Sequence, residues 1–375
     1  MNKFRLGYLA AVLASVFAGC LDDRLAPELN FNVESAIELL VYLESHGDYI
    51  NSEALNEFVP VSEVYANKSS YLIIDVRTQI EFANGHIENA VNVEPKNLLN
   101  YLKSINNSRY PKTVIVSESG QSAAYYTAML RFAGYSNIVS MEYGMAAWHH
   151  DFAAIWLNAI RNFREGPDEL NYFTNQEYPK PSHTNLPQLN FQNGNKSAKE
   201  KLDERILKLL AAGFNERLAD STISPKFAQS ILDDGSPSVL VENVYSSFDE
   251  TANSFTDYHI ICFGNNFLYK AHSRDGPFAA QGHLPSAVLY LPLQDLRSTN
   301  YLQTIPANAI IAVYDANGHT SAKVAAYLRI LGYDVKSILF GANTLFYSRV
   351  LWVSSLEPFA FKQTMIMNFP YVTGN

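Results

Sequence analysis

The sequence predicts an α/β fold with two domains, each built on a central, mostly parallel sheet flanked by helices. Short apolar runs alternate with segments of helical spacing, as in proteins that cover a parallel sheet with helices. Tyr71–Val76 is apolar until Asp75, which is typical of a strand buried on both faces of such a sheet. The sequence pattern that begins near residue 113 is also repeated about 198 residues further along the chain. This repetition indicates a duplicated domain.

Length and composition fit this fold. The chain has 375 residues, of which 47% are hydrophobic and 13% aromatic. This length and composition suffice for two domains that each have a hydrophobic core. The formal net charge is −9, and no basic cluster offsets it. Nucleic acid, which selects basic surfaces, is therefore not expected as a partner.

The N-terminus predicts a targeting segment. Lys3 and Arg5 precede an apolar run of 12 residues, Leu6–Phe17, which is too short to span a bilayer as a helix. The run ends in Phe-Ala-Gly-Cys, which resembles the lipobox of bacterial lipoproteins. That resemblance implies a signal peptide over residues 1–19 and a lipidated Cys20. An ordinary secretory signal with an incidental cysteine is the alternative.

Only one other cysteine exists, Cys262. With Cys20 acylated, no disulfide can form within one mature chain, so stability must come from packed cores. The expected location is the bacterial cell envelope. There the chain would be anchored to a membrane by lipid alone, on the periplasmic or outer-membrane side.

The first domain is expected over residues 58–163, after a tether and an N-terminal helix in residues 20–57. Gly134 follows a helical pattern and can end it. The predicted strands are Tyr71–Val76, Ala90–Val93, Val114–Val116 and Ile138–Val139, and the predicted helices are Val33–His46, Arg77–Ala83, Leu98–Ile105, Ala123–Ala133 and a helix that begins at Gly144–Trp148.

Residues 164–236 are expected to form a linker with helices. The segment 164–200 is rich in Asn, Pro, Gln and Tyr and reads as extended surface chain. Ala198–Ala212 has apolar residues at core spacing, which predicts a helix. Ser224-Pro225 is a typical helix start.

The second domain is expected over residues 237–352, followed by a C-terminal tail in residues 353–375. Val239–Val241 and Ile310–Tyr314 are predicted strands. Aligning Glu242 with Asp75 leaves about thirty extra residues in this copy, near 250–280. Within them, Tyr258–Phe263 is predicted to be an added strand.

Each copy has a short polar loop between a strand and a helix. Such a loop presents backbone N–H groups at a helix N-terminus, a geometry that suits an anion or a thiolate. Ser117 stands at the base of the first loop and Asp315 at the base of the second. The candidate binding residues are Glu118, Ser119, Gly120, Gln121, Ser122 and Ala123 in the first loop, and Ala316, Asn317, Gly318, His319, Thr320 and Ser321 in the second.

Three short motifs follow one another in the first copy, Ile74-Asp-Val-Arg77, Glu81-Phe82 and Gly85-His-Ile87, and Gly282-His283 answers the last of them in the second copy. Together these motifs resemble the rhodanese family, strongly over residues 58–150 and more weakly over 237–352. The resemblance implies two rhodanese-like domains. Enzymes of that family move sulfane sulfur through a persulfide on a cysteine, which stands at the base of the loop between strand and helix. The motif residues, to which we assign structural roles, are Asp75, Arg77, Glu81, Gly85 and His86 in the first copy and Gly282 and His283 in the second.

That cysteine aligns with Ser117 and with Asp315. A persulfide needs a soft thiolate, which neither residue supplies. Ser122 and Thr320 occupy the loop positions where family members often carry a basic residue. We therefore expect no catalytic residue and a binding or scaffolding role. The partner would be an unknown envelope protein or a small anion, with no cofactor.

Two enzymatic alternatives remain open. One is a hydrolase that uses Ser117, for which His86 is the nearest candidate base by motif. The other is a sulfurtransferase that uses a different thiol, although the apolar surroundings of Cys262 favour a buried structural cysteine.

His149-His150-Asp151 could offer ligands to a metal ion. Adjacent residues of a helix do not face one another, so a surface histidine pair is the interpretation we favour and no metal is expected.

Overall fold

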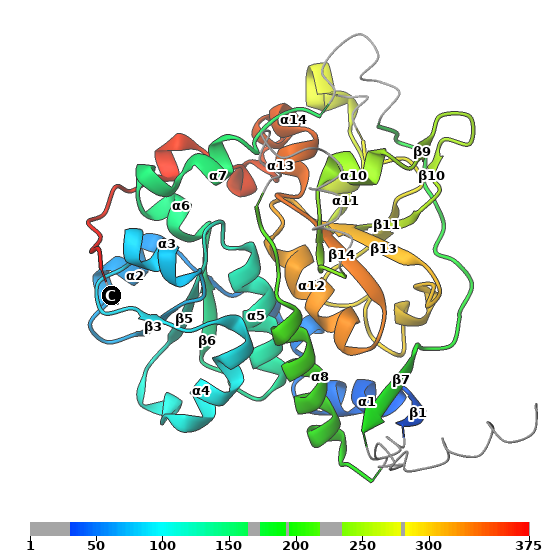
Figure 1. Ribbon diagram of the computed structural model, residues 1–375. Helices are drawn as coiled ribbons and strands as arrows, with labels where there is room; N and C mark the ends of the chain where they lie inside the picture. Colours follow the sequence, from blue (N-terminus) through cyan, green and yellow to red (C-terminus); the bar gives the residue numbers. More distant parts are fainter. Residues whose placement is uncertain (1–30, 164–172, 193–194, 218–234, 279–281, 375) are drawn as a thin grey trace, which may run out of the picture.

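The structure is a computed structural model that describes residues 31–163, 173–192, 195–217, 235–278 and 282–374. It contains two five-stranded sheets, one in each half of the molecule (Figure 1). This confirms the predicted α/β class with two parallel-sheet domains. Within the described residues, no helix is long and apolar enough to cross a membrane.

The first sheet has the strand order β2-β6-β5-β3-β4, and every neighbouring pair is parallel. Buried apolar side chains fill its central strands, as the uninterrupted run at Ile73 and Ile74 predicts. The strands are β2 (Phe58–Val59), β3 (Leu72–Asp75), β4 (Val91–Asn92), β5 (Thr113–Val116) and β6 (Ile138–Met141). The helices are α2 (Val61–Asn67), α3 (Gln79–Asn84), α4 (Leu98–Ser104), α5 (Gln121–Phe132), α6 (Gly144–Trp148) and α7 (Ala154–Leu157), with 3₁₀ turns η3 (Pro95–Asn97), η4 (Asn107–Arg109) and η5 (His150–Phe152).

The second sheet repeats this order as β8-β14-β13-β11-β12, again with parallel neighbours. The strands are β8 (Ser238–Val239), β11 (Tyr258–Phe263), β12 (Val288–Tyr290), β13 (Ile310–Tyr314) and β14 (Asp334–Ile338), and a small hairpin is formed by β9 (Phe248–Asp249) and β10 (Ser254–Phe255). The helices are α10 (Val241–Tyr245), α11 (Asn266–Tyr269), α12 (His319–Ile330), α13 (Ala342–Leu345) and α14 (Tyr347–Trp352), with 3₁₀ segments η7 (Ser273–Phe278), η8 (Leu302–Thr304), η9 (Glu357–Phe359) and η10 (Gln363–Met365).

The matching strand orders correct the expected alignment of the two copies. β11 lies between β12 and β13, as β3 lies between β4 and β5, so it is not an added strand. Cys262, which pairs with Tyr314, is therefore the counterpart of Asp75, which pairs with Val116. Glu242, the expected counterpart, lies in α10. The extra residues of the second copy are consequently fewer than thirty and fall on both sides of β11.

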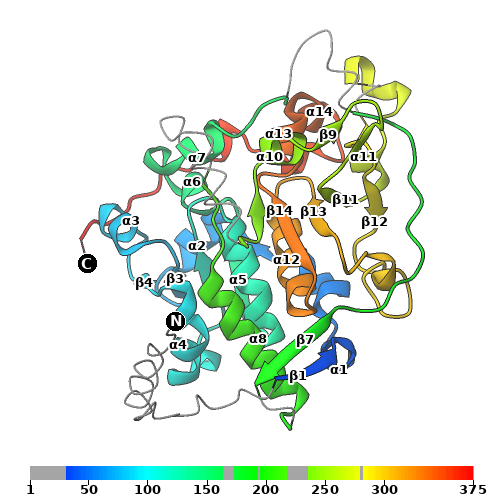
Figure 2. The same ribbon diagram turned by 45° about the vertical axis from the view of Figure 1, so that its right-hand side comes forward.

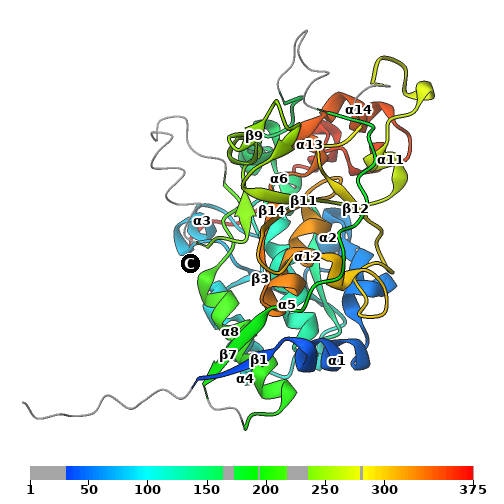
Figure 3. The same cartoon turned by 90° about the vertical axis from the view of Figure 1, so that its right-hand side faces the viewer.

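A separate layer joins the N-terminal segment to the linker. β1 (Phe31–Ser35) pairs antiparallel with β7 (Gln188–Gln192) and is followed by α1 (Ile37–Ser45) (Figure 3). The expected helix Val33–His46 thus begins later than predicted, because its first residues are in a strand. The 3₁₀ turns η1 (Tyr49–Asn51) and η2 (Glu53–Asn56) lead from α1 into the first sheet.

The linker helix α8 (Ala198–Ala212) has the predicted bounds. Ser197 and Glu200 form a capping box at its start, which explains why it begins there. The helix expected at Ser224-Pro225 and the signal peptide lie outside the described residues.

The two halves pack through α5 and α12, which lie side by side between the sheets with α8 across them (Figures 1 and 2). Each of these two helices begins at the end of one of the polar loops, so the packing brings both loops into the contact region. The C-terminal segment then returns to the first half, where Val372 forms a two-bond bridge with His86.

Candidate functional site

The first loop connects β5 to α5 and is folded around the side chain of Ser117. Its hydroxyl accepts hydrogen bonds from the backbone N–H of Gly120 (3.0 Å) and of Ala123 (3.3 Å). Gly120 has a φ of 90°, a left-handed conformation that favours glycine. The loop therefore turns its N–H groups inward, as the sequence predicts.

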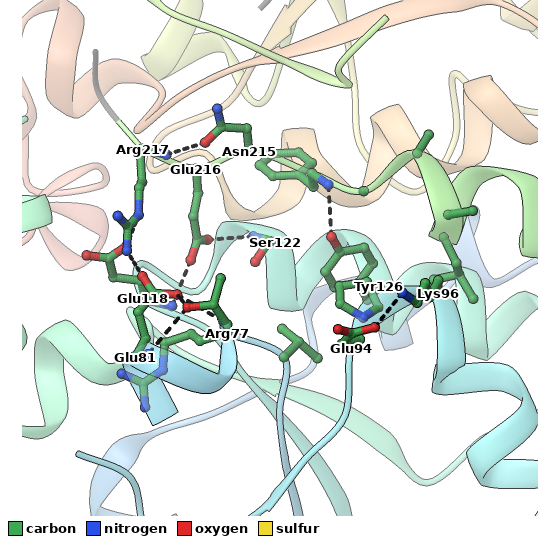
Figure 4. Close-up of a pocket in the computed structure, with 18 of the residues that line it drawn as sticks. Arg77, Glu81, Glu94, Lys96, Glu118, Ser122, Tyr126, Asn215, Glu216 and Arg217 are labelled. Carbon is green, nitrogen blue, oxygen red and sulfur yellow. Dashed lines mark hydrogen bonds and ion pairs between the residues drawn. The ribbon is translucent and has the colours of Figure 1, made fainter. Parts of the chain in front are cut away.

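The cradle is occupied by a carboxylate of the chain itself, that of Glu216 (Figure 4). Oε1 accepts the backbone N–H groups of Glu118 (2.7 Å) and Ser119 (3.0 Å). Oε2 accepts the Ser122 N–H (2.9 Å) and the hydroxyls of Ser119 (2.9 Å) and Ser117 (3.2 Å). Both carboxylate oxygens are thus engaged, as those of a bound anionic ligand would be.

The chain that leaves α8 positions Glu216. Gly213 caps the helix with a φ of 75°, and the next N–H, of Phe214, donates to the Tyr126 hydroxyl on α5 at 2.8 Å. Arg217 forms ion pairs with Glu81 on α3 and with Glu118 in the loop itself. The segment is therefore held on both sides of Glu216, which is itself buried.

A cavity of about 680 Å³ borders the occupied loop (Figure 4). The segment Leu210–Arg217 and the start of α5 form one side of it, and the residues between β3 and α3 form another. Its ionisable lining residues are Arg77, Glu81, Glu94, Lys96, Glu118, Glu216 and Arg217. Four acids against three bases give a lining that does not attract a small anion such as thiosulfate.

Glu118, in the lining of this cavity, has a shifted pKa. Burial, and secondarily the neighbouring carboxylate of Glu216, raise its pKa to about 7. Two carboxylates near one another at the loop make a further negative charge there unfavourable.

The second loop also holds a carboxylate, supplied by its own base residue. Asp315 Oδ1 accepts the Gly318 N–H (2.5 Å) and the Ser321 hydroxyl (3.0 Å), and Oδ2 accepts the Thr320 N–H (2.9 Å). Burial raises the pKa of Asp315, and the hydrogen bonds from the loop oppose that shift. Both oxygens are engaged inside the loop, so an external amine does not meet a free carboxylate here.

The two loops face each other across the contact between the halves. The Phe340 N–H donates to the Gln121 side chain at 2.7 Å, and His319 Nε2 lies 3.2 Å from the Ser119 carbonyl oxygen. A Cβ at Gly318 would collide with the same Gln121 side chain. Gln121 and His319, expected as ligand-binding candidates, therefore join the two copies instead.

The remaining motif residues of the first copy have structural contacts. Arg77 binds the Asp75 carboxylate (2.6 Å) and the Gly85 carbonyl oxygen (2.7 Å), and so links the end of β3 to the end of α3. Glu81 belongs to the capping box that starts α3. His86 Nδ1 lies 2.8 Å from the Phe82 carbonyl oxygen, on the side of the C-terminal segment. The group against the Ser117 hydroxyl is Glu216, so His86 is not placed as its base.

In the second copy, a residue of α14 binds the turn at Gly282 and His283, which corresponds to Gly85 and His86 in the first copy. Arg349, on α14, is fully buried and donates to the carbonyl oxygen of Gly282 at 3.0 Å, as well as to three others between Phe267 and Lys270. His283 Nδ1 lies 2.6 Å from the Tyr269 carbonyl oxygen.

Cys262 is fully buried in β11, and burial raises its pKa to about 12. A thiol of that kind is inert, which agrees with the structural role favoured from its sequence context.

Sequence reasoning missed Glu216, Tyr126 and Arg349. Glu216 lies 99 residues from Ser117, and nothing in its local sequence distinguishes it from a solvated acid after a helix. Only the packing of α8 on α5 brings it to the loop.

Comparison with known proteins agrees with the motif resemblance. The rhodanese-like domain family matches residues 61–151. The thiosulfate sulfurtransferase GlpE of Shewanella oneidensis is 32% identical over 98 residues, which are 26% of this chain and 89% of that protein.

Among solved structures, a rhodanese-related protein of Thermoplasma volcanium is 26% identical, with 24% of this chain and 86% of that one covered and a TM-score of 0.22. A thiosulfate sulfurtransferase of Pseudomonas aeruginosa is 13% identical, with 83% and 48% covered and a TM-score of 0.24.

Proposed function

Since the chain belongs to the rhodanese-like family, we propose that it is a non-catalytic member with two rhodanese-like domains and a binding or scaffolding role. We further propose that it is lipid-anchored through Cys20 in the bacterial cell envelope. The observation that carries the non-catalytic part is the occupation of both loops by carboxylates of the chain. Glu216 fills the loop of Ser117, and Asp315 fills its own.

Each feature of these loops works against sulfur transfer. A sulfane sulfur must be carried by a polarisable thiolate, and a serine hydroxyl is not ionised at neutral pH. The N–H groups that would stabilise a thiolate or an anionic donor already have a carboxylate as partner. An incoming thiosulfate would have to displace Glu216 beside a second acid, Glu118.

The binding role rests on what the first loop recognises. Three backbone N–H groups and two hydroxyls hold one carboxylate there, so the loop is complementary to that group. The external ligand that this loop fits best is consequently a carboxylate on an acidic side chain of an envelope protein, because the other contacts of a protein partner can offset the acidic surroundings of the loop, whereas a free small anion has no such contacts. Such a ligand would enter from the cavity of about 680 Å³ and replace Glu216.

A thiosulfate:cyanide assay on the full-length chain, purified in detergent, tests the non-catalytic proposal. We expect no thiocyanate above the level of the S117A and C262S variants. Those variants are matched controls because each removes one candidate nucleophile by a small change.

Turnover that disappears in C262S would refute the proposal and favour the sulfurtransferase alternative. Turnover of an ester substrate that disappears only in S117A would favour the hydrolase alternative. The anchor is tested independently by mass spectrometry of the mature protein from its native host. An unmodified N-terminus, or retention of residues 1–19, would contradict it.

A further inference from the structure

A cluster of potential metal ligands lies outside the loops, at the end of α6. From its geometry we propose that His149, His150 and Asp151 form a binding site for a zinc-class divalent transition metal ion. One ligand atom from each of the three residues lies within 4.8 Å of the other two. The proposal is independent of the role assigned to the loops.

The backbone at this point makes the cluster possible. α6 ends at Trp148, and His149 is extended, with φ −150° and ψ 148°. The expectation that these neighbours diverge as on a helix is therefore wrong. The two imidazole rings lie 4.5 Å apart, centroid to centroid, and tilt by 40°.

The Asp151 carboxylate contacts a nitrogen atom of each ring. Its Oδ2 is 3.3 Å from His149 Nδ1, and its Oδ1 is 2.9 Å from His150 Nε2. In a tetrahedral zinc site with bonds of about 2.0 Å, neighbouring ligand atoms are roughly 3.3 Å apart. Side-chain adjustments of about 1 Å would thus bring the three atoms onto a common centre.

The ligand types select the ion. Two imidazoles and one carboxylate suit zinc and its neighbours, whereas magnesium and calcium prefer sets made of oxygen alone. His150 and Asp151 are exposed, so water can complete the coordination. Binding would replace the direct contact between His150 Nε2 and the Asp151 carboxylate. It would also replace the hydrogen bond of 3.2 Å from the Asp151 N–H to His149 Nδ1.

The C-terminal segment supports the cluster from outside. The Tyr371 hydroxyl donates to Asp151 Oδ2 at 2.7 Å, and its ring lies 5.1 Å from that of His149. Asn368 Oδ1 accepts the His150 N–H at 3.0 Å. The Tyr371 contact orients the carboxylate, and partners of this kind tune metal affinity. Tyr371 is accordingly a positioning residue.

Calorimetric titration of the full-length chain with ZnCl₂ tests the proposal. We expect one zinc ion per chain, with affinity at least about tenfold lower in H150A and in D151N. Y371F should weaken binding less than either. H183A removes an exposed histidine elsewhere and is the matched control, with wild-type affinity expected.

Equal zinc affinity in wild type, H150A and D151N would overturn the proposal, as would equal losses in H150A and H183A. Thermal melting of each variant without zinc shows whether it is folded. In folded chains, zinc should raise the melting temperature of wild type and H183A but not of H150A. MgCl₂ at the same concentration should leave all of them unchanged.

Discussion

Replacing Glu216 with alanine tests whether the first loop needs its carboxylate. The change removes five hydrogen bonds and leaves the N–H groups of Glu118, Ser119 and Ser122 without that partner. An unsatisfied buried donor costs about 1–3 kcal/mol, and water from the adjoining cavity would replace part of the loss. Relief of the repulsion between Glu216 and Glu118 offsets another part.

The net expectation for E216A is a loss of about 2–3 kcal/mol in the free energy of unfolding. For a chain of 375 residues that loss corresponds to about 2.5–4 °C in melting temperature. E216Q should lose less, because its carbonyl oxygen can still accept the two N–H groups of Glu118 and Ser119. E53A removes an exposed carboxylate on η2 and is the control.

Sodium formate provides the decisive assay, because it supplies a carboxylate without the side chain. Formate should raise the melting temperature of E216A more than that of wild type or E53A, since a ligand stabilises the state that binds it. Sodium chloride at equal ionic strength corrects for general salt effects. The reasoning fails if E216A melts like E53A, or if formate and chloride act alike on E216A.

Three other predictions concern titration and thiol chemistry. Because the pKa of Glu118 is raised to about 7 from 4.5, its contribution to stability is full below about pH 4.5 and is lost as the pH rises through 7. At pH 8 the free energy of unfolding of E118Q should therefore exceed that of wild type by about 1–2 kcal/mol, whereas at pH 4.5 the two should be equal. Equal urea midpoints at pH 8 would contradict this prediction. The S117C variant should react slowly with iodoacetamide, because Glu216 fills the cradle. The double variant S117C/E216A should react at least about tenfold faster, since the freed N–H groups then stabilise the Cys thiolate. Equal rates would disprove that Glu216 and a thiolate compete for these N–H groups. Native Cys262 should resist a disulfide reagent until the chain is unfolded, because burial raises its pKa to about 12, and rapid labelling in native buffer would contradict its burial.

Local sequence signals were sufficient for most of the fold. The bounds of α8 follow from the capping box of Ser197 and from apolar spacing, which both act within one helix. β3 and β5 were predictable because strands buried on both faces need uninterrupted apolar runs. The offset between the two copies could be read from the repeated loops. Each loop needs a residue with positive φ, which favours glycine, so Gly120 and Gly318 mark the same position in both copies.

The sequence was misleading where strands are short. Val239–Val241 has the apolar character of a central strand, yet only its first residue belongs to β8 and α10 begins at Val241. Tyr258–Phe263 forms the interior strand β11 beside β13 instead. Strand order depends on pairing across the sheet, and two equally apolar runs cannot be ranked by composition.

The candidate site was predictable only in part, for the same reason. The inward N–H groups follow from the strand, glycine and helix of each loop, but the occupant of the first loop depends on where α8 packs. The two occupants also differ for a physical reason. The Asp315 side chain is long enough to reach the N–H groups of its own loop, whereas the Ser117 hydroxyl accepts two of them and leaves three for Glu216.

Burial explains why a loop without its nucleophile still holds an anion. Backbone N–H groups that converge in a buried contact need an acceptor, because leaving them unpaired costs more than most single interactions contribute. Ser119 and Asp315 are both buried where the two copies meet. In an active sulfurtransferase a substrate or thiolate can serve as that acceptor. With Ser117 and Asp315 at the loop bases, one carboxylate of the chain in each loop meets the same requirement, so both loops keep a geometry that holds an anion.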